Sequence, residues 1–299
     1  MKLSKHTPLI IVMACLMTLA LLGSAAWGWP RHHGHPAPKP TATAPVTPSP
    51  SPSTPTPVPT VTTDGTFSGP AAPAGWGVTY SRNFASTPGQ GDWVTQPGNN
   101  APILDSTKAG AEFGVGIETT ALSQWSELIS SNAVVGPNSF VQGLVYIPAG
   151  SGSRPDGHTF PAGSTANWPA FWTFGNPWPQ NGEIDALEAQ TGRSCEQTHY
   201  SSGPSSSTEL NSPSNCGALG ATSTGWLTVS MLRQGEQVKV WYNNTYIGEV
   251  PLPTTANEKL VFQNQSYSTS VCGNCFGPTL LGSASTAWLS NVRVYAPAS

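Results

Sequence analysis

Residues 226–250 read WLTVSMLRQGEQVKVWYNNTYIGEV, which is three short apolar runs joined by two turn-forming pairs. In the middle run Val238, Val240 and Tyr242 alternate with residues of other types, and a period of two is that of a β-strand with one buried face. Gln234-Gly235 and Asn243-Asn244 supply the residues that tight hairpin turns favour. The segment therefore predicts antiparallel β-hairpins.

The same pattern continues outward from this segment over most of the chain. No stretch beyond residue 63 has a helical period of useful length. Because short strands must share one core and hide their edges, we expect an all-β fold, an antiparallel β-sandwich. The runs that predict strands are Gly77–Tyr80, Phe140–Ile147, Ala170–Phe174, Glu183–Ala189, Trp226–Leu232, Val238–Tyr242, Leu260–Gln263 and Trp288–Tyr295.

The first 64 residues differ in composition from the rest. Residues 1–26 combine basic residues, an apolar run and small residues in the order of an export signal. Residues 27–64 are rich in Pro, Thr and Ser and predict a disordered linker. We therefore expect a folded domain over residues 65–299 in a secreted, extracellular protein. It would contact a membrane, as a cell-surface tether, only if the first segment is not cleaved.

Charged residues are scarce in this chain, and their scarcity excludes a function. They make up 9% of the sequence and give a formal net charge of −3, so no basic surface for nucleic acid is implied. The 11 Trp residues against this neutral background suit a protein that presents aromatic faces to a neutral, hydroxyl-rich ligand.

Four cysteines follow the export signal. An even number of cysteines in an exported chain predicts two disulfides, and three pairings are possible. Proximity in the sequence favours Cys195 with Cys216 and Cys272 with Cys275. The second pair forms a C-x-x-C motif, but no second metal-binding pair has the right spacing and no basic residue lies nearby. We therefore predict structural disulfides and no metal site.

Three carboxylates lie close together in residues 168–190, WPAFWTFGNPWPQNGEIDALEAQ. Glu183 and Asp185 are two residues apart on a predicted strand, so they point to the same face about 6.7 Å apart along the chain. Glu188 is five residues from Glu183, and strict alternation would send it to the opposite face. A β-bulge at Ala186-Leu187 would return it to the side of the other two acids.

Three acids on one face suit the cleavage of a glycosidic bond with retention of configuration. That reaction needs two carboxyl groups about 5 to 5.5 Å apart. We assign Glu183 as the nucleophile and Glu188 as the acid/base, its pKa raised by neighbouring negative charge. Asp185, which lies between them, would fix their charge and proton positions by hydrogen bonding. A calcium site would need more oxygen ligands than this run offers. Sugar stacking is predicted for three tryptophans just upstream, Trp168, Trp172 and Trp178.

The run W-P-A-F-W followed by W-P-x-x-G-E-I-D-x-x-E resembles glycoside hydrolase family 16, the laminarinase-type group. The resemblance implies a retaining, endo-acting enzyme on a concanavalin A-like β-jelly roll, with the roles just given to the three acids. It also implies that His199 lines the cleft beside the nucleophile and that Trp172 and Trp178 contact sugar. It implies no organic cofactor and leaves room for a structural calcium ion.

The sequence also departs from that family. The strand expected over residues 140–147 lacks the family's charged residues, and the loop over residues 151–167 is longer than usual. The substrate choice of the family is therefore a poor guide to the substrate of this chain. We expect a β-1,3- or β-1,3-1,4-glucan, although galactans are cut by the same family. The alternative is an inactive, lectin-like module, which would have little use for all three acids. We expect a monomer that acts on a polysaccharide through a covalent glycosyl-enzyme intermediate.

Overall fold

The computed structural model describes residues 67–84, 92–97, 103–105, 114–200, 210–211, 224–271 and 273–298. All of them belong to one unit, Pro59–Ser299. The predicted export signal and linker lie outside the described residues, as do Cys216 and Cys272, so these expectations stay predictions. Among the described residues, no helix is long and apolar enough to cross a membrane.

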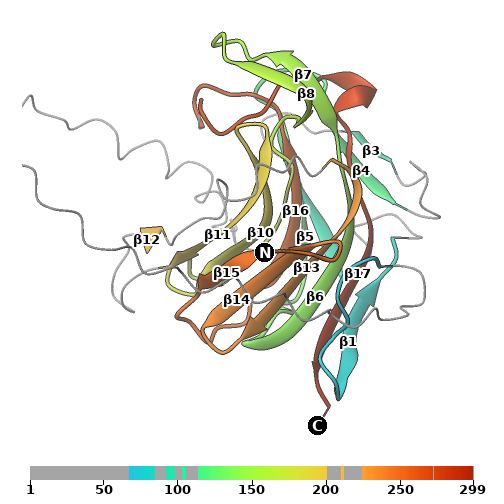
Figure 1. The fold of residues 1–299 in the computed structure, drawn as a ribbon, viewed down its shortest axis with the longest axis vertical. Coiled ribbons are helices and arrows are strands. Elements are labelled where there is room, and N and C mark those ends of the chain that lie inside the picture. The colour runs from blue at the N-terminus through green and yellow to red at the C-terminus, as the bar shows by residue number, and fades with distance from the viewer. Residues whose placement is uncertain are drawn as a thin grey trace, which may run out of the picture. The chain divides into compact units, whose positions relative to one another are not determined.

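Two antiparallel sheets make up the fold, and Figure 1 shows them as two layers. The first sheet has the strand order β15 (Thr245–Pro251), β14 (Gln237–Tyr242), β13 (Gly225–Gln234), β6 (Asn138–Ile147), β17 (Ala287–Pro297), β4 (Val115–Glu118) and β3 (Ile103–Asp105), and β1 (Trp76–Arg82) also pairs with β17. The second has the order β12 (Leu210–Asn211), β11 (Arg193–Tyr200), β10 (Glu183–Gln190), β9 (Ala170–Phe174), β16 (Lys259–Gln265), β5 (Trp125–Ser130) and β2 (Trp93–Pro97).

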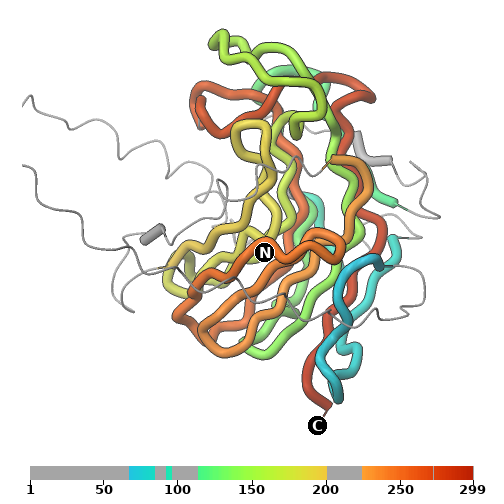
Figure 2. Tube along the Cα trace, viewed as in Figure 1, coloured from blue at the N-terminus to red at the C-terminus, as the bar shows by residue number. Residues whose placement is uncertain are grey.

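Two smaller elements complete the described part of the chain. Strands β7 (Ala149–Ser153) and β8 (Thr159–Thr165) form a separate hairpin, and a short 3-10 helix spans Gly282–Ser285. Figure 2 shows β1 and β17, which are far apart in the sequence, running side by side. This pairing brings residues from near the two ends of the described domain together in the first sheet.

The predicted all-β, antiparallel sandwich is confirmed, and every run that predicted a strand forms one. The hairpins expected in residues 226–250 are β13, β14 and β15. Their turns contain Gly235 with a φ of 60° and Asn243 with a φ of 54°, a conformation that Gly and Asn adopt most readily. Along β14 the predicted alternation is also found, with Val238 and Val240 buried.

The core lies between the two sheets and is filled by apolar side chains from both. One contact shows how closely the layers approach each other. The ring of Phe171 on β9 lies over Gly143 on β6, where an added Cβ would come within 2.8 Å of a ring carbon. Glycine at this position lets an aromatic ring from the second sheet pack directly against the backbone of the first. This packing supports β9 and, next to it, β10.

Candidate active site

Strand β10 contains the predicted β-bulge. Asp185 pairs with Gln197 on β11, and Glu188 pairs with Cys195. Two residues of β10, Ala186-Leu187, therefore lie opposite one residue of β11, which is the defining feature of a bulge. The prediction of a bulge at these two residues, made from the spacing of the acids, is confirmed.

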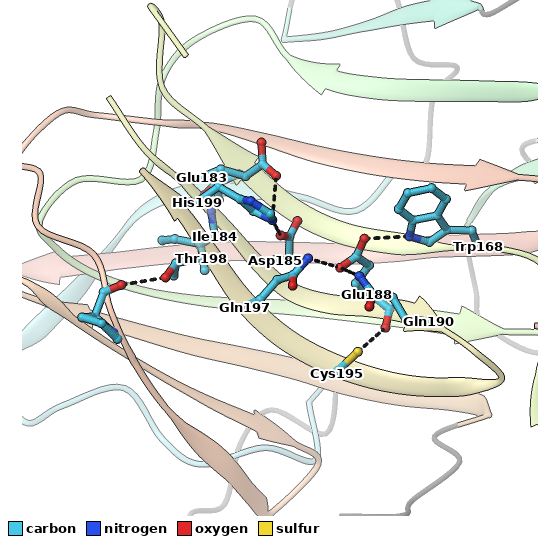
Figure 3. Close-up of polar contacts among 12 residues, drawn as sticks. Trp168, Glu183, Ile184, Asp185, Glu188, Gln190, Cys195, Gln197, Thr198 and His199 are labelled. Carbon is cyan, nitrogen blue, oxygen red and sulfur yellow. Dashed lines mark hydrogen bonds and ion pairs between the residues drawn. The ribbon is translucent and has the colours of Figure 1, made fainter. Parts of the chain in front are cut away.

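The bulge brings the three carboxylates to one face of the second sheet. Figure 3 shows Glu183, Asp185 and Glu188 spread along β10, with side chains of β11 between them. Ile184 and Leu187 are fully buried in the core between the sheets. The face of β10 that bears the acids, here named the catalytic face, is thus polar, while its opposite face is apolar.

His199 lies between two of the acids. Its Nε2 is 3.1 Å from Oδ2 of Asp185 and 3.7 Å from Oε1 of Glu183, the residue it pairs with across the strands. The three side chains are between 6% and 14% exposed, so water screens their interaction weakly. Nε2 of His199 is thus in ion-pair range of both carboxylates when the ring is protonated. The structure therefore places His199 beside Glu183.

The same three residues could in principle hold a metal ion. Their ligand atoms lie within 4.8 Å of one another. Two carboxylates and one imidazole are fewer ligands than calcium takes, and this set would suit a transition metal better. The expectation that the enzyme works without a metal or cofactor stays a prediction.

Glu188 is surrounded by three N–H donors. The indole Nε1 of Trp168 donates to its Oε1 at 2.9 Å, and the side-chain amides of Gln190 and Gln197 each donate to its Oε2 at 2.6 Å. Burial raises the pKa of Glu188 to about 8, and the negative charge of Asp185 adds to the rise, while the charge of His199 and the hydrogen bonds from Gln190 and Trp168 oppose it. Glu188 is therefore protonated at neutral pH.

The hydrogen bonds also indicate which oxygen of Glu188 carries that proton. A carboxyl oxygen has two lone pairs, and the amides of Gln190 and Gln197 use both of those on Oε2. On Oε1 the indole of Trp168 uses one lone pair and leaves the other for a proton. The transferable proton is thus on Oε1.

The three predicted stacking tryptophans have different surroundings. Trp168 packs edge-on against Phe276 and directs its N–H at Glu188, so its contact with the site is a hydrogen bond to an acid. Trp172 pairs with Asp185 across the strands and is half-buried. The indole N–H groups of Trp172 and Trp178 are buried and have no hydrogen-bond partner in the described residues.

Sequence reasoning missed three residues on the catalytic face. Gln190 and Gln197 could be recognised only once the strand pairing was known. Glu127 lies on β5, and it can be traced from Glu188 through pairs of opposite residues, Ala170 on β9 and Gln263 on β16. Residues opposite each other share a face, so Glu127 lies on the catalytic face, three strand spacings or about 14 Å from β10. Burial raises its pKa to about 7.

One of the cysteines lies close to Glu188. Cys195 and Cys275 are each disulfide-bonded. Because Cys216 and Cys272 lie outside the described residues, the pairing of the four cysteines stays a prediction. The Sγ of Cys195 lies 3.4 Å from the backbone oxygen of Glu188. A disulfide bond at this position would restrain β11 directly opposite Glu188.

The comparisons with known proteins agree with this geometry. Residues 155–234, which include β9, β10 and β11, match the family model described as "XgeA-like, catalytic GH16 domain". No curated protein matches the chain. Solved structures with the same fold include an endo-β-1,3-glucanase from Pyrococcus furiosus, at 18% identity over 75% of this chain and 95% of that chain with a TM-score of 0.52.

Two further structures share the fold. The endo-1,3-β-glucanase from Streptomyces sioyaensis is 15% identical over 77% of this chain and 99% of its own, with a TM-score of 0.51. The glycoside hydrolase family 16 endo-glucanase from Bacteroides ovatus, in complex with G4G3G-2F-DNP, is 13% identical over 73% of this chain and 100% of its own, with a TM-score of 0.52. At these identities the likeness describes the fold.

A β-sandwich with a bulged strand that carries three acids defines the class of protein, a glycoside hydrolase. With the matching family model and the shared jelly-roll fold, the resemblance drawn from the sequence is confirmed. Residues 155–234 are therefore similar to the catalytic domain of glycoside hydrolase family 16, and the fold is shared with solved endo-β-1,3-glucanases.

Proposed function

We propose that this enzyme is a retaining endo-glycosidase that cuts internal linkages of a β-1,3- or β-1,3-1,4-glucan. The observation that carries the proposal is the contrast between two acids on one bulged strand. Glu188 is buried and protonated at neutral pH, with a pKa of about 8. Glu183 lies next to His199 instead. A retaining enzyme needs one carboxyl group that gives a proton and one that attacks.

In the first step, Glu183 attacks the anomeric carbon while Glu188 transfers the proton on Oε1 to the glycosidic oxygen. The bond between the anomeric carbon and that oxygen breaks, its electron pair stays on the oxygen, and an ester bond to Glu183 forms. Asp185 and His199 hold the attacking carboxylate in place. Removing the proton from Glu188 leaves a carboxylate that the N–H donors of Trp168 and Gln190 stabilise.

In the second step, Glu188 takes a proton from water while the water oxygen bonds to the anomeric carbon. The ester bond breaks, and Glu183 returns as a carboxylate. Each step inverts the anomeric carbon, so the product keeps the β configuration. The N–H groups that hold the Glu188 carboxylate between the steps are the same ones that surround it at rest.

Several observations support a neutral β-glucan as the substrate. Trp172 is half-buried and lies opposite Asp185 on the neighbouring strand, so its ring is on the catalytic face, where it could stack on a sugar. Solved structures with the same fold are named as endo-β-1,3-glucanase and endo-glucanase. Low overall charge and the signal-like first 26 residues support action outside the cell on an uncharged polymer.

The full chain, wild type and Glu183→Ala, should be incubated with a panel of β-glucans and β-galactans. We expect wild type alone to release oligosaccharides from β-1,3- or mixed-linkage glucan, and the first product observed by NMR to be the β-anomer. Initial release of the α-anomer would rule out retention. Azide sharpens the assignment, because Glu183→Ala should form an α-glycosyl azide, whereas Glu188→Ala, its matched control, should form the β-azide.

A further inference from the structure

The bulge on β10 leaves one residue outside the register of the sheet. Ala186 is skipped in the register with β9 and also in the register with β11. A residue inside a central strand normally pairs with both neighbours. The Ala186 carbonyl is buried, and a buried carbonyl requires a hydrogen-bond donor.

The donor comes from the opposite sheet. Tyr242, the last residue of β14, passes its side chain through the apolar core, and its hydroxyl lies 3.1 Å from the Ala186 oxygen and 3.0 Å from the Cys195 oxygen. Cys195 is the residue opposite Glu188. A single phenol hydroxyl thus joins the two strands at the site of the bulge.

We propose that Tyr242 is a positioning residue, whose hydroxyl holds the β10 bulge in the register that keeps Glu188 on the catalytic face. This inference rests on the proposed function of Glu188. A slip of one residue would send Glu188 towards the core, because side chains alternate along a strand. The hydroxyl is the group placed to oppose that slip, since it joins Ala186 on one strand to the partner of Glu188 on the next.

The hydroxyl also stays a donor over the working pH range. Burial raises the pKa of Tyr242 well above its ordinary value, and the negative charges of Glu196, Glu188 and Asp185 add to the rise. The group is 5% exposed and belongs to the core cluster, so water does not replace it. In Tyr242→Phe the ring would keep its packing, and only the hydrogen bonds to the bulge would be lost.

The test compares Tyr242→Phe with Tyr80→Phe in the full chain. Tyr80 is the matched control because its hydroxyl also bonds within the fold, to Asp92 and Trp93, but lies on β1. Displacing a reacting group by about 1 Å costs on the order of 100-fold in rate. We expect Tyr242→Phe to lose about that much in kcat, keep its KM and move the alkaline limb of its pH–rate profile. We expect Tyr80→Phe to change none of these.

The outcomes distinguish a failure of the positioning role of Tyr242 from a failure of the proposed function. Wild-type kcat and pH profile in Tyr242→Phe, with a lowered melting temperature alone, would overturn the positioning role. A wild-type enzyme inactive on every glucan would overturn the proposed function and this inference with it. If Tyr242→Phe does not fold, Tyr242→His takes its place, because its ring N–H is a donor of shorter reach. Lowered kcat with unchanged KM is then expected, and wild-type kcat would refute the proposal.

Discussion

Glu188 and Glu258 are both buried carboxylic acids, and the difference between their surroundings separates a reactive acid from a structural one. Oε1 of Glu258 lies 3.3 Å from the Nη1 of Arg233, and its Oε2 accepts a hydrogen bond from Thr173. Burial raises the pKa of Glu258 to about 7, against the opposing effect of Arg233. Glu188 has only neutral N–H donors in hydrogen-bond contact, and burial raises its pKa to about 8.

The comparison teaches that burial alone does not identify a catalytic acid. Arg233 is fully buried and also donates to the backbone oxygens of Ala256 and Thr254, so the ion pair with Glu258 ties a loop to β13. A carboxylate held by a fixed cation and a hydroxyl group has a structural role. Glu188 has no such cation in hydrogen-bond contact, as a group that is proposed to change its charge during a reaction requires.

The largest expected effect follows from removing the reactive acid. In Glu188→Ala, kcat on a polysaccharide should fall by about 10²–10⁴-fold, the usual contribution of a general acid. A substrate with a dinitrophenyl leaving group needs no proton from the enzyme, so the first step on it should stay within about tenfold of wild type. Burst kinetics on both substrates measure this. Equal losses on the two substrates would mean that Glu188 is not the acid.

The structural acid should respond in the opposite way. Arg233→Met leaves Glu258 buried without its cation, and the free energy of unfolding should fall by about 3–5 kcal/mol. Below the melting temperature, kcat should change little. Denaturant unfolding of Arg233→Met and of the control Arg233→Met/Glu258→Leu checks this, because an apolar pair should recover most of the loss. A double variant no more stable than the single one would show that the ion pair is not the source of the effect.

A smaller effect links the charge of Glu188 to stability. Its pKa is about 8 in the folded protein against a reference value of 4.5, so between these pH values the folded state binds one more proton than the unfolded state. Stability from this group is therefore fully present below about pH 4.5 and is lost as pH rises through 8. Glu188→Gln, which has no such titration, should gain on the order of 10 °C in melting temperature over wild type between pH 5 and pH 8. A constant difference from pH 5 to 8 would contradict the raised pKa.

Some strands were predicted from the sequence and others were not. The two groups differ in how apolar their buried face is. β14 and β17 alternate apolar and other residues, and the period of two identifies them. β5 and β11 place polar residues in the core as well as on the catalytic face, among them Ser126, Glu196 and Thr198, all fully buried. With polar residues on both faces, no hydrophobic alternation marks these strands.

The candidate site could be predicted where one strand carries it. Glu183, Asp185 and Glu188 lie within six residues, and their common chemistry required the bulge that the structure contains. Partners from other strands depend on register, which local sequence does not define. Gln197 and Tyr242 reach β10 through a neighbouring strand and through the opposite sheet, so neither could be assigned beforehand.

The smallest effect concerns a single hydrogen bond to the reactive acid. Gln190 donates to Oε2 of Glu188 at 2.6 Å and lowers its pKa. In Gln190→Ala the ionised form loses that support, so the pKa of Glu188 should rise and the alkaline limb of kcat/KM should move to higher pH. The rate should fall by about fivefold, because the carboxylate formed in the first step has lost a bond worth about 1 kcal/mol. Glu249→Gln on the first sheet, where Glu249 faces Lys239, is the control. If the alkaline limb moved to lower pH instead, Glu188 would not be the proton donor whose ionised form Gln190 stabilises.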